Sequence, residues 1–125
     1  MNTFPTGIKD LDLQLLSTIG SDRDLLNTLS VKNKTILKYA NDESLWRNRF
    51  KQKYPQDFDY VRSILTGSWK KFYLSLITYL EGGINYLKKF PQATSKHLII
   101  YDKAMQLAAE DNNFDLVNYF FFKGV

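Results

Sequence analysis

Few residues of the chain could carry out acid–base or nucleophilic chemistry. His97 is the only histidine among the 125 residues, and the chain has no cysteine. A single histidine without cysteine or clustered carboxylates is a poor metal site, and a Ser–His–Asp triad would need partners that no spacing in the sequence indicates. The sequence therefore predicts no metal site and no catalytic role for His97.

Two pairs of carboxylates, Asp22/Asp24 and Asp57/Asp59, lie two residues apart. Residues with this spacing point about 200° apart on a helix, so neither pair can act on one substrate, and we interpret both as charges at helix starts. The pair Gly82–Gly83 lacks the strand and the Lys–Ser/Thr sequence of a phosphate-binding loop. We predict that the protein is not an enzyme and needs no cofactor.

The basic residues suggest a second kind of chemistry, the binding of phosphates. The net charge is +4, with 17 basic and 13 acidic residues. The clusters are Lys32, Lys34 and Lys38; Arg47, Arg49, Lys51 and Lys53; and Lys70, Lys71, Lys88 and Lys89. Each cluster occupies the polar side of a predicted helix, so we interpret the clusters as solvated faces. A basic helical nucleic-acid-binding domain remains the alternative.

The helix predicted over residues 41–54 organises the chain. Asn41 or Asp42 can cap its first turn, and acids at its start and bases at its end suit the helix dipole. Trp46, Phe50 and Tyr54 recur every fourth residue and so share one face. We expect this aromatic face to be buried, which makes the role of Trp46 structural.

Other helices are predicted from caps, breakers and apolar spacing. Before residue 41 we expect helices from Asp10 to near Gly20, from Ser21 or Asp22 through Leu29, and over about 31–40, with Ile36, Leu37 and Ala40 facing inward. After residue 54 we expect helices over about 57–66, 68–81, 84–90, 94–109 and 114–122, with a break at Gly82–Gly83 and a turn at Asp111–Asn113. The predicted fold class is all-α.

Composition limits the class of protein further. Hydrophobic residues make up 44% of the chain and aromatics 15%, enough for one compact domain or two small units. No apolar run is long enough to span a membrane, and residues 1–9, a lead that we expect to be loosely ordered, lack the pattern of a signal peptide. We therefore expect a cytosolic protein.

Two segments resemble known families. Residues from about Ile8 to Tyr54 resemble the F-box-like domains of large DNA viruses that infect amoebae. The resemblance rests on Asp24–Leu25–Leu26–Asn27, on Asn33–Lys34 and on Asn41–Asp42–Glu43–Ser44–Leu45–Trp46–Arg47–Asn48–Arg49–Phe50. The segment from Ala104 to Val125 is similar to one ankyrin repeat. These resemblances divide the chain into an F-box-like helical module at 1–55 and a helical part at 56–125, with the ankyrin-like pair at about 102–125.

The F-box-like resemblance implies a non-enzymatic protein-interaction function. Members of the family dock on the Skp adaptor of cullin–RING ubiquitin ligases, and their C-terminal part holds a substrate. Such a protein would act in the host cytoplasm as a viral substrate adaptor. A structural protein of the virion or viral factory is a further alternative.

The leucine pattern predicts where a partner would bind. The first helix carries more leucines than one buried face can hold, and the neighbours Leu25 and Leu26 cannot both point into the same core. We predict a partner-binding surface made by Ile8, Leu11, Leu15, Leu25 and Leu26. In the competing arrangement, residues 57–125 cover these leucines within the chain.

Overall fold

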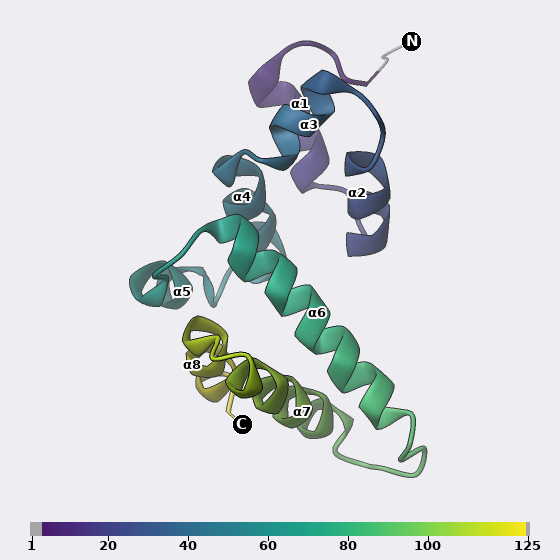
Figure 1. Ribbon diagram of the computed structural model, residues 1–125, viewed down its shortest axis with the longest axis vertical. Coiled ribbons are helices and arrows are strands. Elements are labelled where there is room, and N and C mark those ends of the chain that lie inside the picture. Colours follow the sequence, from purple (N-terminus) through teal and green to yellow (C-terminus); the bar gives the residue numbers. More distant parts are fainter. Residues whose placement is uncertain (1–3, 125) are drawn as a thin grey trace. The chain divides into compact units, whose positions relative to one another are not determined.

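The computed structural model describes residues 4–124, which form eight helices and contain no strand (Figure 1). The helices are α1 (Lys9–Ser17), α2 (Asp22–Leu29), α3 (Lys34–Ala40), α4 (Glu43–Lys53), α5 (Phe58–Ile64), α6 (Trp69–Leu87), α7 (Lys96–Glu110) and α8 (Phe114–Phe122). The all-α prediction is confirmed. Residues 1–3 of the predicted lead and Val125 of the ankyrin-like segment lie outside the described residues.

The chain divides into two compact units. The N-terminal unit extends to Arg62 and includes Ser68–Lys70, and the C-terminal unit comprises Ser63–Gly67 and the residues from Lys71 onward. The division therefore falls inside α5 and just after the start of α6. Each unit has its own set of packed helices, so each is described separately below.

In the N-terminal unit, α1 packs on α4 and α2 packs on α3. Helix α4 supplies the largest core side chains, since Leu45, Trp46 and Phe50 are at most 1% exposed. The indole nitrogen of Trp46 donates a 2.9 Å hydrogen bond to the carbonyl oxygen of Ala40, so the buried ring leaves no unpaired polar atom. The predicted burial of Trp46 and Phe50 is confirmed, while Tyr54 is only half-buried.

Side-chain caps set the starts of three helices in this unit. Ser21 accepts a hydrogen bond from the backbone N–H of Asp24, and Asp42 accepts one from Ser44, as predicted. Asn33 caps α3, which therefore begins at Lys34 and not near residue 31. These oxygens satisfy N–H groups that the first helical turn leaves unpaired.

Two predictions about the first and third helices are wrong. Asp10 does not cap α1, which begins at Lys9 with no side-chain cap. Leu37 was expected to face inward but is 61% exposed, whereas Tyr39 is buried. Ile36 and Tyr39 are three residues apart and occupy the inner face of α3, which is only seven residues long.

In the C-terminal unit, α6 continues through Gly82 and Gly83 to Leu87, so the predicted break is wrong. A Cβ atom at Gly82 would lie 2.5 Å from the Cδ1 atom of Leu107, and one at Gly83 would collide with the backbone carbonyl of Ile100. Both contacts are with α7. The glycines therefore allow α7 to approach α6 closely, and this packing outweighs their low helix propensity.

Helices α7 and α8 pack against each other across the predicted turn at Asp111–Asn113 (Figure 1). Asn112 adopts a φ of 57°, a left-handed conformation that asparagine tolerates better than most residues. The side chain of Asn113 caps α8 by accepting a hydrogen bond from Leu116. Ala104 and Ala108 are fully buried on α7, so small residues again permit close helix packing.

Candidate protein-interaction surface

Helix α1 has two apolar faces, of which one is buried and one is exposed. Leu13 and Leu16 are at most 5% exposed, whereas Ile8, Leu11 and Leu15 are 61%, 41% and 44% exposed. Leu11 and Leu15 are four residues apart and lie about 40° from each other around α1. Ile8 is the N-cap residue that directly precedes the helix. We call Ile8, Leu11 and Leu15 the α1 stripe.

The two other residues of the predicted surface have different environments. Leu26 is 36% exposed, but Leu25 is completely buried and belongs to the core. Leu25 is therefore removed from the predicted surface. The opposite environments of these neighbours confirm that they cannot share one core, as the sequence predicted.

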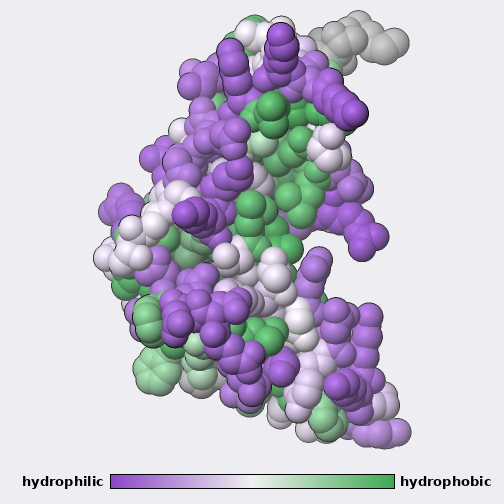
Figure 2. Space-filling model, in the orientation of Figure 1, coloured by the Kyte–Doolittle hydropathy of each residue, from purple (hydrophilic) through white to green (hydrophobic). Residues whose placement is uncertain are grey.

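A second apolar area lies over α2 and α3 in the N-terminal unit (Figure 2). A groove of about 510 Å³ there is lined by Leu29, Ser30, Val31, Lys32, Asn33, Lys34 and Leu37. Because α1 packs on α4 and α2 packs on α3, the α1 stripe and this groove belong to different helix pairs.

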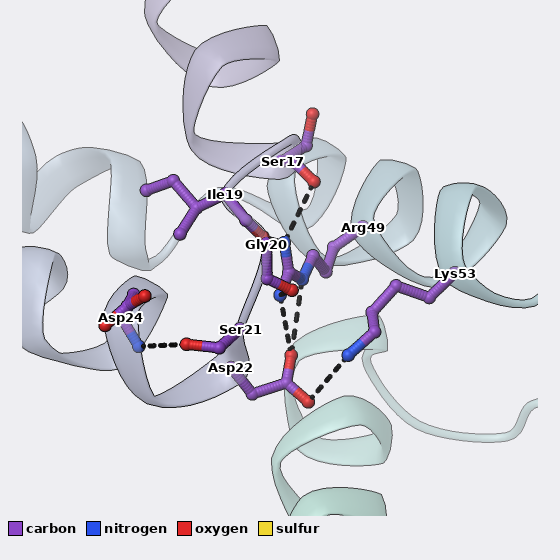
Figure 3. Close-up of polar contacts among 8 residues, drawn as sticks. All are labelled: Ser17, Ile19, Gly20, Ser21, Asp22, Asp24, Arg49 and Lys53. Atoms are coloured by element: carbon purple, nitrogen blue, oxygen red, sulfur yellow. Dashed lines mark hydrogen bonds and ion pairs between the residues drawn. The ribbon is translucent and has the colours of Figure 1, made fainter.

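Arg49 fixes the turn between α1 and α2 (Figure 3). Its guanidinium group donates to the carbonyl oxygens of Ser17 and Gly20, each at 3.2 Å, and to that of Ile19. Nη2 also lies 2.9 Å from the carboxylate of Asp22. The bonds satisfy carbonyl groups near the C-terminal end of α1, which have no partner within the helix.

The prediction that Arg49 belongs to a solvated basic face is wrong, since the residue is 1% exposed. Burial of an arginine is favourable only where its charge is paired and its donors are satisfied. Lys53 adds a second cation on Asp22, with 3.1 Å between Nζ and Oδ2 (Figure 3). Asp22 is thus an ion-pair partner as well as a helix-start charge. The burial of Arg49 could have been predicted from the sequence, because Arg49 follows Trp46 by three residues and therefore lies on the buried face of the helix.

Asp12 ties the segment before α1 to the unit. Its carboxylate accepts hydrogen bonds from Thr6, through both the backbone N–H and the hydroxyl, and from the backbone of Gly7. The hydroxyl of Tyr39 donates to the same carboxylate at 2.7 Å. The described part of the lead is therefore held by Asp12, contrary to the prediction of loose order, and the buried carboxylate was not found from the sequence.

These hydrogen bonds shift the pKa values of both Asp12 and Tyr39. Burial by itself would raise the pKa of Asp12, but the bonds from Thr6, Tyr39 and Gly7 lower it below its ordinary value. The bond to Asp12, burial and the charge of that carboxylate raise the pKa of Tyr39 to about 12. Asp12 is therefore ionised at neutral pH and accepts these hydrogen bonds as a carboxylate.

His97 was the first residue considered for enzymatic chemistry. His97 is exposed on α7, and its ring lies 4.4 Å from that of Tyr101. Within residues 4–124, no group of three or more His, Asp or Glu side chains could hold a metal ion. In the same part of the chain, no helix combines the length and apolar character that crossing a membrane requires.

Comparisons with protein-family models, curated proteins and solved structures gave no match. The features of this chain that bear on function are therefore the α1 stripe, the contacts that hold α1 in place and the motif resemblances of the sequence.

Proposed function

We propose that this protein is a non-enzymatic protein-interaction module of the F-box-like kind, and that the α1 stripe binds its partner. The observation that carries the proposal is the exposure of three large apolar residues, two on the short helix α1 and one at its N-cap. Contiguous exposed apolar residues are uncommon on soluble monomers and commonly mark protein-binding surfaces. Such a surface buries apolar area on binding and requires no catalytic group.

The contacts around α1 support this role because they fix the helix before a partner arrives. Asp12 holds one end of α1 through Thr6 and Gly7, and Arg49 holds the carbonyl groups at the other end. A surface that is already ordered loses less conformational entropy on binding than a mobile one. The α1 stripe therefore suits a partner that recognises a fixed helical face.

The resemblance of residues 8–54 to F-box-like domains makes a Skp-type adaptor the proposed partner. The C-terminal unit would then hold a substrate, and the protein would serve as a viral substrate adaptor for a host ubiquitin ligase. Its contribution to ubiquitin transfer would be proximity, which raises the local concentration of substrate lysines near the loaded enzyme.

Isothermal titration calorimetry of the full chain against a purified host Skp adaptor tests the proposal. We expect binding that is lost in Leu15→Asp, because a charge would then be buried in the interface. Leu37→Asp is the matched control, since Leu37 has the same side chain as Leu15 and is also exposed in the same unit but lies on α3. No heat and no co-elution at roughly tens of micromolar protein would contradict the adaptor proposal.

A further inference from the structure

A polar cleft opens between α1 and α4 of the N-terminal unit. It encloses about 450 Å³. The lining residues are Lys9, Asp10, Leu13, Gln14 and Ser17 from α1 and Ser44, Arg47, Asn48, Lys51 and Gln52 from α4. Three cations and one carboxylate thus surround a cleft whose remaining polar groups are amides and hydroxyls.

Two of the three cations in this cleft, Arg47 and Lys51, have no ion-pair partner among residues 4–124. Arg47 and Lys51 lie four residues apart on α4, a spacing at which like charges repel. Arg47 has neither an ion pair nor a hydrogen bond to its guanidinium group within residues 4–124, and the ammonium group of Lys51 lies 5.2 Å from the ring centre of Phe58. Lys9 lies 3.3 Å from the carboxylate of Asp42.

Arg49, two residues beyond Arg47, shows the opposite situation. Asp22 and three backbone carbonyls satisfy its guanidinium group, so that arginine has a complete structural role. Arg47 is exposed and lines the cleft, and its guanidinium group donates to no acceptor among the described residues 4–124. An anionic ligand would relieve the repulsion between Arg47 and Lys51 and use these donors.

We propose that the α1–α4 cleft binds a small phosphate monoester. A guanidinium group can donate two parallel hydrogen bonds to phosphate oxygens, and a lysine ammonium contributes a compact charge. Arg47 would bind the phosphate in this way, with Lys51 and Lys9 adding charge. The amides of Gln14 and Asn48 can donate to the remaining oxygens, and a cleft of about 450 Å³ has room for the group that carries the phosphate.

This site differs from the protein-binding surface proposed above. Asp10 and Gln14 precede Leu11 and Leu15 by one residue each, which places them about 100° away around α1. The cleft and the α1 stripe therefore occupy different sides of the helix. Occupancy of one does not require occupancy of the other, so the two proposals can fail independently.

Two-dimensional NMR of the full chain, titrated separately with inorganic phosphate and with O-phosphoserine, tests the site. We expect saturable shifts of α1 and α4 amides and of the Arg47 side-chain N–H. Stronger binding of O-phosphoserine would assign the site to monoesters with an attached group, whereas equal affinity would still support it but assign recognition to the phosphate alone. Shifts that are spread over both units or do not saturate would overturn it.

Charge-matched variants separate this site from general basicity. Arg47→Gln with Lys51→Gln should weaken O-phosphoserine binding about tenfold or more, since each lost charged hydrogen bond is strong. Lys32→Gln with Lys34→Gln removes the same charge from the same unit and should leave affinity unchanged. Equal weakening in both variants, or tighter binding of a single-stranded oligonucleotide than of O-phosphoserine at physiological salt, would contradict the proposal. Unchanged melting temperatures would show that the variants fold.

Discussion

The two units stabilise their helices by different means. The N-terminal unit begins with helices of nine, eight and seven residues and joins them through the buried polar side chains Asp12 and Arg49. In the C-terminal unit, Gly82 and Gly83 allow the 19-residue α6 and the 15-residue α7 to approach closely. Short helices bury little apolar area, so hydrogen bonds to specific groups must define how they pack. Long helices can rely on close contact of small residues.

The largest expected effect is in the aromatic core of the N-terminal unit. Trp46→Ala should lower the free energy of unfolding by about 3–5 kcal/mol, because it leaves a large cavity and an unpaired carbonyl at Ala40. Leu37→Ala, at an exposed position, should change it by less than about 0.5 kcal/mol. Denaturant unfolding measures both values, and an unchanged midpoint for Trp46→Ala would contradict the assigned core.

The next largest change in stability is expected for Arg49, in contrast to Arg47 on the same helix. Arg49→Met should destabilise the unit by about 2–3 kcal/mol, because the carbonyls of Ser17, Ile19 and Gly20 lose their donor. Arg47→Met should have an effect within about 0.5 kcal/mol, since its side chain is exposed. Urea denaturation of the two variants compares them. Equal effects would show that burial of Arg49 does not stabilise the α1–α2 turn.

Gly83→Ala tests the close packing of α6 against α7, because helix propensity and packing predict opposite changes in stability. Helix propensity alone predicts stabilisation of about 0.5–1 kcal/mol, but the new methyl group would meet the carbonyl of Ile100. We expect a net destabilisation of about 1–3 kcal/mol from overpacking. Gly67→Ala is the control, because an added Cβ there meets no atom within 4 Å. A raised melting temperature for Gly83→Ala would disprove the close approach of α7.

The smallest effect is a pH dependence in the N-terminal unit. Folding raises the pKa of Tyr39 to about 12, above its value near 10 in an unfolded chain. The resulting stability is fully present below pH 10 and is lost as pH rises toward 12. Folding lowers the pKa of Asp12, so its contribution is lost as the solution becomes acidic through that lowered pKa.

Thermal melts between pH 8 and 12 measure the alkaline half of this prediction. The melting temperature of the unsubstituted chain should fall more steeply above pH 10 than that of Tyr39→Phe. Tyr79→Phe makes the corresponding comparison in the other unit, where burial and the hydrogen bond to Asp111 also raise the pKa of Tyr79, and it should flatten the slope in the same direction. The same slope in Tyr39→Phe and the unsubstituted chain would rule out the Tyr39–Asp12 contribution.

Much of the fold followed from local sequence patterns. Predicted residues 114–122 coincide with α8, and Ser21 and Asp42 cap helices as their side-chain chemistry indicates. The break at Gly82–Gly83 was wrong because the space needed by α7 is a tertiary property, which helix propensity does not contain. The exposure of Leu37 depends on which face of the seven-residue α3 its neighbours cover, which local pattern does not contain.

The candidate surface was only partly predictable, because exposure depends on tertiary packing that local sequence patterns do not contain. Leucine spacing separates Leu11 and Leu15 from Leu13 and Leu16 on α1, but it does not show which face another helix covers. The adjacency of Leu25 and Leu26 indicates opposite environments without identifying the buried member. The long-range bonds of Arg49 to the α1–α2 turn join residues about 30 positions apart, beyond the reach of local patterns.

Hydrogen–deuterium exchange of the full chain with and without a host Skp adaptor tests the proposed function most directly. Since bound surfaces exclude solvent and restrict local opening, the account predicts slower exchange in α1 on adding the adaptor, with Leu15→Asp abolishing the change. Exchange in α7 and α8 should stay the same. Unchanged exchange in α1 at saturating adaptor, or protection confined to the C-terminal unit, would contradict binding through the α1 stripe.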